Sequence, residues 1–209
     1  LFSFFADPEN VAVYINALSA ISSSLTILFM FWSLTLLIKK IVLKQGDTLT
    51  GGNQIAIFSA AGIGALAYTF SDSFWYSAVE GEVYAMSSFF TALVFWAILK
   101  WEHEANENGA DRWIVFIFFM MGLSIGVHLL NLLAIPAICF VYYFKKYEKI
   151  SLKGFIYTGL ISLALLALMQ TGIIIYFVKL AAWFEKLFVN GFHLGFNTGV
   201  LFYLLLVAA

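Results

Sequence analysis

Long apolar runs separated by short polar segments make up almost all of this 209-residue chain. A run of roughly 20 apolar residues is enough for a helix to cross the hydrocarbon core of a bilayer. The pattern therefore predicts an all-α protein, a polytopic transmembrane helical bundle that forms one domain over residues 1–209. The predicted spans are residues 11–43, 55–70, 83–101, 113–127, 130–144 and 154–177, with the start of another at 198–209.

Both ends of the chain interrupt this pattern. The chain begins at Leu1 without a methionine. The last apolar run stops at Ala209, after about half of the roughly 20 residues that a span needs. We therefore expect the chain to be an internal fragment, truncated at both ends, of a larger multi-pass protein.

Residues 113–144 are too long for one upright span and too short for two full ones. Lysine and arginine concentrate on the cytoplasmic side of membrane proteins, which discriminates between the two topologies. One span would divide the 11 basic residues seven to four, whereas two short helices that turn near 126–131 divide them nine to two. We therefore predict a helical hairpin. The nine residues are Lys39, Lys40, Lys44, Lys100, Arg112, Lys145, Lys146, Lys149 and Lys153.

This topology gathers polar segments on the non-cytoplasmic side of the membrane. They are the stretch 71–84, the hairpin turn and the segment 179–197, which is predicted to be an aromatic, amphipathic loop in the membrane interface. Trp183, Phe188 and Phe192 would anchor that loop.

Composition agrees with a membrane protein, since 63% of the residues are hydrophobic and 11% are charged, against roughly 25% charged in a soluble domain. The formal net charge is -1 and no basic tract occurs, so we expect no nucleic-acid partner. The single Cys139 excludes a disulfide within the chain.

Three carboxylates, Asp72, Glu80 and Glu82, lie in the stretch SDSFWYSAVEGEVY. A carboxylate is costly in hydrocarbon, so this stretch belongs in the interface or in a wet cavity, and we take the three as candidate catalytic groups. Glu80 and Glu82 would diverge by about 200° on a helix, but would share a face in an extended loop. We expect one to face a cavity and the other to cap the helix that starts near residue 83. Aromatic rings often flank sugars or lipid headgroups. Trp75, Tyr76 and Tyr84 are therefore candidate substrate-binding residues.

Further substrate-binding candidates lie in the other two polar segments: His128 and Asn131 in the hairpin turn, and His193 and Asn197 in 179–197. His128 has two interpretations. It could be a packing residue that donates to the freed carbonyls of the turn, or a functional group that faces a lipid phosphate.

The serines of the first helix have two interpretations as well. They could pack against neighbouring helices, or line a polar cavity together with Asn16. Ala60 and Gly64 of the next helix are spaced for close helix packing. No metal site is predicted, because His103 and its neighbouring glutamates lie in a loop without fixed geometry.

Two strings, FWYSAVEGEVYAMSSFFTALVFWAILKWE and GLSIGVHLLNLLAIPAI, resemble a family of multi-pass membrane proteins common in Bacteroidetes. FVNGFHLGFNTGVLF is similar to a later extracytoplasmic loop of that family. The family is grouped with the GT-C glycosyltransferases, near the protein O-mannosyltransferases, and the resemblance covers nearly the whole chain.

The resemblance implies a GT-C-like fold and a bacterial inner-membrane transferase that uses a polyprenyl-phosphate-linked sugar. Its acceptor would be a periplasmic protein or glycan. In that family an extracytoplasmic loop before the first helix holds an acidic W-D-x-G-E motif and a His-Pro-Pro-Gly element. Neither motif occurs in this chain, so the main catalytic base is expected upstream of Leu1.

Our reading of the whole sequence is therefore a membrane glycosyltransferase. Glu80 or Glu82 would orient the acceptor or a divalent cation, the one cofactor considered, while His128 and Asn131 would face the donor. A transporter or lipid flippase is the alternative, although no internal repeat supports it. A non-catalytic membrane scaffold is the third reading.

Overall fold

The structure, a computed structural model, describes residues 8–43 and 48–208. It divides the chain into two compact units, Leu1–Glu148 (unit 1) and Lys149–Ala209 (unit 2). Helices and short connections account for all of the described residues, so the predicted all-α fold is confirmed.

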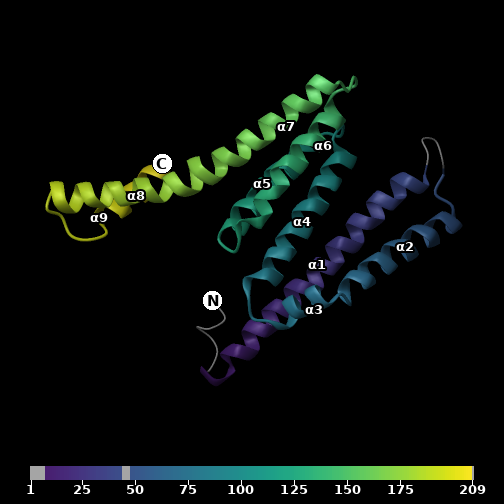
Figure 1. Cartoon of the computed structure of the whole chain (residues 1–209), viewed down its shortest axis with the longest axis horizontal. Coiled ribbons are helices and arrows are strands. Elements are labelled where there is room, and N and C mark those ends of the chain that lie inside the picture. The colour runs from purple at the N-terminus through teal and green to yellow at the C-terminus, as the bar shows by residue number, and fades with distance from the viewer. Residues whose placement is uncertain (1–7, 44–47, 209) are drawn as a thin grey trace. The chain divides into compact units, whose positions relative to one another are not determined.

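Unit 1 is an assembly of six α-helices that run back and forth between its two ends (Figure 1). A short 3-10 helix, Pro8–Asn10, leads into the first of them, and another, Leu129–Leu133, precedes the last. The six are α1 (Val11–Val42), α2 (Gly51–Thr69), α3 (Asp72–Val79), α4 (Val83–Glu104), α5 (Asp111–Ile125) and α6 (Ala134–Lys146).

Unit 2 is one long helical run followed by a loop and a final helix (Figure 1). The run contains two π-helical stretches, Leu168–Ile175 and Leu187–Gly191. Its α-helical parts are α7 (Leu152–Ala167) and α8 (Tyr176–Lys186), and the final helix is α9 (Thr198–Ala208).

Four helical segments among the described residues are long and apolar enough to cross a membrane: Val11–Val42, Val83–Glu104, Leu129–Lys146 and Leu152–Gly191. A fifth is counted if α2 and α3, which are bent by 66° relative to each other, form one broken span. The protein is therefore a polytopic membrane protein. Helix α5 has 15 residues, or about 22 Å, less than the roughly 30 Å of a bilayer core.

Helix α4 is the centre of unit 1, because it packs against α1, α5 and α6. Aromatic rings make much of this contact. The ring of Trp96 on α4 lies 5.2 Å from that of Phe29 and 5.5 Å from that of Trp32 on α1. On its other side, Trp96 meets Trp113 of α5 edge-on at 5.6 Å. One ring thus joins three helices.

Small hydroxyl residues form the buried stripe of α1, namely Ser19, Ser22, Ser23, Thr26 and Ser33. The hydroxyls of Thr26 and Ser33 donate to backbone carbonyls one turn earlier, at 2.8 Å each. Such bonds satisfy the hydroxyls within the helix and let α1 approach its neighbours closely. Thr26 and Ser33 therefore serve helix packing.

The close-packed face of α2 differs from the predicted one by one position. Ala60 is exposed, whereas Ile57, Ala61 and Ala65 are buried. Gly64 does contribute, because a Cβ there would lie 3.0 Å from Leu34 of α1. The buried small residues Ala61 and Ala65 are also spaced i and i+4, so the predicted spacing occurs one position later along the helix.

One end of unit 1 carries its described basic residues. They lie at the last turns of α1, α4 and α6 and the first turn of α5, and they are Lys39, Lys40, Lys100, Arg112, Lys145 and Lys146. Ion pairs join them across helices, Lys40 to Glu102 and Arg112 to Glu104. Of the other residues predicted on this side, Lys44 lies outside the described residues, and Lys149 and Lys153 belong to unit 2.

The prediction of a loop over residues 179–197 is wrong for most of that segment. The helical run continues through residue 191, for 40 residues in all, which is about 60 Å and twice the thickness of a bilayer core. Phe188 packs within the unit, with its ring 5.1 Å from that of Phe202 on α9, whereas Trp183 and Phe192 are exposed. Aromatic pairing with α9 thus extends the helix where composition suggested a loop.

Gly199 provides a test of the α8–α9 contact. A Cβ at this position would lie 2.4 Å from the carbonyl oxygen of Phe184, a backbone atom that cannot rotate away. We expect Gly199→Ala to destabilise the full-length protein by about 1–3 kcal/mol, as overpacking does, measured as a lower thermal midpoint in detergent. Gly122→Ala in α5 is the control, because nothing lies within 4 Å of its Cβ position. Equal midpoints for the two variants would contradict the contact.

Candidate functional site

A cavity of about 530 Å³ lies at the end of unit 1 opposite the basic residues. Three elements enclose it: the first half of α1, the loop that leads into α4, and the turn that follows α5. Its lining residues are Ile15, Leu18, Ser19, Ser22, Gly81, Glu82, Val83, Met86, Gly126 and Val127. The acidic stretch, residues 71–84, and the hairpin turn thus meet at one cavity.

The loop between α3 and α4 brings Glu82 to this cavity. Gly81 permits the close approach, because a Cβ there would lie 2.8 Å from Ile15 Cγ2 and 3.0 Å from Asn16 Oδ1. Glu80 and Glu82 both have extended backbone, and they flank this contact. Both glutamates are exposed, but only Glu82 lines the cavity, whereas Glu80 is the C-cap residue of α3.

Glu82 is also the N-cap residue of α4, although its side chain makes no capping hydrogen bond. We expected one glutamate to face a cavity and the other to cap the helix, but Glu82 occupies both positions. The N-terminus of a helix carries a partial positive charge, which favours an ionised carboxylate there. Its carboxylate, not engaged as a cap, can accept hydrogen bonds from a ligand.

The serines of α1 supply the second polar wall of the cavity. Ser19 and Ser22 line it, so the cavity interpretation holds for these two serines. The adjacent Ser23 and, on α4, Ser87 are buried, and their Oγ atoms have no hydrogen-bond partner in the described part of the chain. Asn16, the other predicted lining residue, is exposed and meets the loop at Gly81.

Helix α3 places the remaining candidates of the acidic stretch outside the cavity. Asp72 is exposed in its first turn, where the helix dipole favours a carboxylate. Phe74 anchors the helix, with its ring 4.6 Å from that of Tyr68. Trp75 and Tyr76 are 54% and 65% exposed, so they form an aromatic surface on the outside of unit 1.

The hairpin turn is built around Ser124. Its carbonyl accepts from the backbone N–H groups of Val127 and His128 at 2.9 and 2.8 Å. Its hydroxyl accepts a hydrogen bond from Asn131 Nδ2 at 3.0 Å and donates to the carbonyl of Met121. Asn131 is 1% exposed and does not line the cavity. Its Nδ2 holds the turn together, whereas its buried Oδ1 has no hydrogen-bond partner among the described residues.

His128 is half-buried beside the turn. Its Nδ1 accepts a hydrogen bond from the backbone N–H of Leu130 at 3.1 Å, and so caps the 3-10 helix. In the packing interpretation the ring would donate to carbonyls of the turn, but its Nδ1 accepts instead. The other interpretation, in which His128 faces a lipid phosphate, stays a prediction. The ring also lies 6.0 Å from that of Tyr84, which is 52% exposed. Tyr84 and His128 thus form a contact between α4 and the turn.

The candidates of unit 2, His193 and Asn197, are both exposed in the loop before α9. Both have positive φ, 55° and 72°, a region that few side chains adopt. A residue not singled out from the sequence orders this loop: Glu185 of α8 accepts backbone hydrogen bonds from Asn197 at 2.5 Å and from Val200 at 3.0 Å. No local pattern indicated this role, because the bonds span a loop.

No group of three His, Cys, Asp or Glu side chains arranged to hold a metal ion occurs among the described residues. Among the described side chains that line the cavity, the oxygen-bearing ones are Glu82 and the two serines.

Comparison with known proteins identifies the family of unit 1. Residues 1–151 match the family model of the protein O-mannosyl-transferase TMEM260 N-terminal domain. The chain belongs to this family. The match covers all of unit 1, including the cavity, and confirms the relation to O-mannosyltransferases inferred from sequence strings. No curated protein and no solved structure matches the chain.

Removing the hydrogen bond between Asn131 and Ser124 tests whether Asn131 has a packing role or a binding role in this O-mannosyl-transferase-family domain. We expect Asn131→Ala and Ser124→Ala each to lower the stability of the full-length protein by about 1–3 kcal/mol, because each leaves a buried partner unsatisfied. The double variant should lose less than the sum of the two, since both remove the same bond. Thermal unfolding in detergent measures all three. Unchanged stability with lost binding of a sugar donor would contradict this assignment.

Proposed function

We propose that the protein is a membrane glycosyltransferase that moves a sugar from a polyprenyl-phosphate carrier to a periplasmic protein or glycan. The single observation that carries the proposal is the placement of the Glu82 carboxylate in a cavity of a domain that belongs to the O-mannosyl-transferase family. A cavity at one end of a helical bundle suits a lipid-linked donor, because the carrier chain stays in the bilayer while the sugar leaves it.

In the transfer, an acceptor hydroxyl attacks the anomeric carbon of the sugar. The bond between that carbon and the carrier phosphate breaks, and the phosphate leaves with the bonding electrons. The hydroxyl proton passes to a base, for which a carboxylate is suitable. Glu82 would orient a hydroxyl of the acceptor or of the sugar by accepting its hydrogen bond. Ser19 and Ser22 would bind further hydroxyls across the cavity.

Exposed aromatic residues of the acidic stretch would give the acceptor a surface. Tyr84 projects beside His128, and Trp75 and Tyr76 are exposed on α3, which packs against α1. We propose that these rings contact sugars or lipid headgroups. Asp72 and Glu80, exposed on the same stretch, would keep this surface acidic. His193 and Asn197 remain substrate-binding candidates on a separate unit.

The proposed location is the bacterial inner membrane, with the cavity on the periplasmic face. The grouping of the described basic residues at the other end of unit 1 supports this orientation under the positive-inside rule. A divalent cation, if the reaction uses one, would be held by Glu82 together with the phosphate of the donor.

A transporter or lipid flippase is the second candidate, favoured by the 66° bend between α2 and α3. Discontinuous helices form the binding sites of many transporters. Movement of a polyprenyl-phosphate sugar across proteoliposomes without a covalent product would favour it over transfer.

Glu82 and Glu80 form a matched pair for testing the proposal. In the full-length protein in proteoliposomes, we expect Glu82→Gln to lower transfer from a polyprenyl-phosphate sugar about 10- to 100-fold, because a charged hydrogen bond contributes about 1.5–3 kcal/mol. Glu80→Gln, two residues away and outside the cavity, should change the rate less than two-fold. Radiolabelled sugar recovered in the acceptor is the readout. Equal rates for wild type and Glu82→Gln would remove Glu82 from the mechanism.

A further inference from the structure

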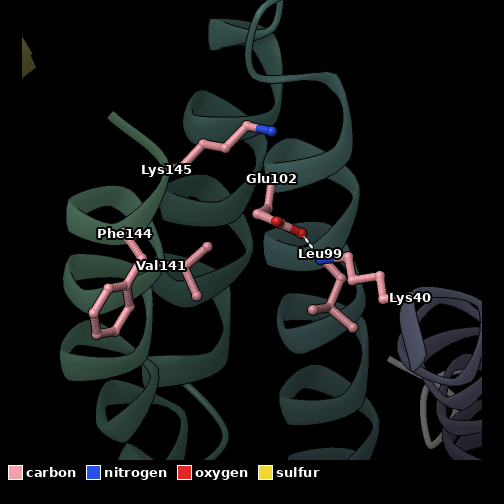
Figure 2. A pocket seen from close by; sticks show the side chains of 6 residues that line it. All are labelled: Lys40, Leu99, Glu102, Val141, Phe144 and Lys145. Atoms are coloured by element: carbon pink, nitrogen blue, oxygen red, sulfur yellow. Dashed lines mark hydrogen bonds and ion pairs between the residues drawn. The ribbon is translucent and has the colours of Figure 1, made fainter. Parts of the chain in front are cut away.

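A second pocket, of about 240 Å³, lies at the basic end of unit 1, among the last turns of α1, α4 and α6 (Figure 2). Its lining combines three charged side chains with three apolar ones: Lys40, Glu102 and Lys145, and Leu99, Val141 and Phe144. It shares no lining residue with the cavity that contains Glu82.

The charges of this pocket are unbalanced. Lys40 of α1 forms an ion pair with Glu102 of α4, drawn as a dashed line in Figure 2. Lys145 of α6 extends over the same opening and is half-buried. Its ammonium group has no hydrogen bond or ion pair among the described residues. Two lysines and one glutamate thus leave the pocket with a formal charge of +1.

The adjacent lysine, Lys146, differs from Lys145 in having a hydrogen-bond partner in the described part of the chain. Lys146 donates a hydrogen bond to the carbonyl oxygen of Ala105 at 3.1 Å, and so ties the end of α6 to the end of α4. A partly buried charge without a partner is unfavourable, and an anion beside it relieves that cost. Lys145 is therefore available to a ligand, whereas Lys146 is used by the fold.

The apolar half of the pocket indicates what kind of anion fits. Leu99, Val141 and Phe144 are apolar residues of two membrane-spanning segments, in their last two turns. A ligand that contacts them and Lys145 together needs a negative group joined to hydrocarbon. Basic pockets between the ends of membrane helices bind the headgroups of anionic lipids in this way.

We propose that this pocket binds the phosphate headgroup of an anionic phospholipid of the surrounding membrane. Lys145 contacts the phosphate, and Lys40, which is paired with Glu102, adds positive charge beside it. An acyl chain lies along Leu99, Val141 and Phe144. The bound lipid joins α1, α4 and α6 at the end of unit 1 that lacks the Glu82 cavity. The proposal is independent of the glycosyltransferase proposal.

The test uses full-length protein in nanodiscs of phosphatidylcholine with increasing fractions of phosphatidylglycerol. A lipid that binds the folded state raises the thermal midpoint as its fraction rises. We expect this rise in the wild type, and about a five-fold higher phosphatidylglycerol fraction for the same rise in Lys145→Gln, the loss typical of one lysine near an anionic headgroup. Lys145→Arg should behave like the wild type.

Two further variants make the test specific. Lys146→Gln removes the same charge one residue away. It should lower the midpoint in every nanodisc while keeping the phosphatidylglycerol-dependent rise. Glu102→Gln removes the carboxylate that pairs with Lys40 and repels phosphate. The thermal midpoint of this variant should therefore rise at lower phosphatidylglycerol fractions.

Two results would overturn the proposal. Equal weakening by Lys145→Gln and Lys146→Gln would show a diffuse surface charge and no pocket. An equal rise caused by inorganic phosphate in pure phosphatidylcholine nanodiscs would show that the pocket takes a free anion and does not need a lipid.

Discussion

The packing of α4 against α1 is the contact on which both pockets of unit 1 depend. In a bilayer no hydrophobic force drives one helix onto another, so close approach and ring contacts must hold the pair together. The hydroxyl stripe of α1 and the ring of Trp96 supply this contact along the middle of the helices. The two helices run parallel, because residues near both N-termini line the Glu82 cavity and residues near both C-termini form the pair Lys40–Glu102. One helix pair therefore builds two sites of opposite charge at its two ends.

A second constraint acts on the hairpin turn between α5 and α6. Backbone groups within a membrane must be satisfied by protein or water, and this turn satisfies them with backbone bonds and with the side chains of Ser124 and His128. Ser124, His128 and Asn131 each use a hydrogen bond to hold the turn. Pro136 fits the following helix because it lies in the first turn of α6, where a missing N–H leaves no bond unmade. These bonds hold the turn in the conformation in which Gly126 and Val127 form one side of the cavity.

Unit 2 shows the limit of composition as a guide to loops. Residues 179–191 contain lysines, a glutamate and exposed aromatic residues, which is typical of an interfacial loop, yet they continue the helix from α7. What keeps them helical is α9, which packs its rings against Phe184 and Phe188. Glu185 then binds the backbone at the start of α9. The contact partner lies after the loop, so no local window of sequence contains it.

The sequence by itself determined the class of this protein and its helical bundle, because long apolar runs leave a chain few alternatives in a membrane. Its relation to O-mannosyltransferases came from the resemblance of particular sequence strings, not from the apolar pattern. It also indicated that the acidic stretch and the hairpin turn share one side, since charge asymmetry sets topology. Only the tertiary structure decided which candidates meet. Glu82 faces the cavity and Glu80 does not, because Gly81 contacts Ile15 of a helix more than 60 positions earlier in the chain. Asn131, predicted from sequence to bind substrate, is placed by the structure in a buried hydrogen bond with Ser124. Such distinctions depend on contacts between distant residues, which spacing along a single chain does not encode.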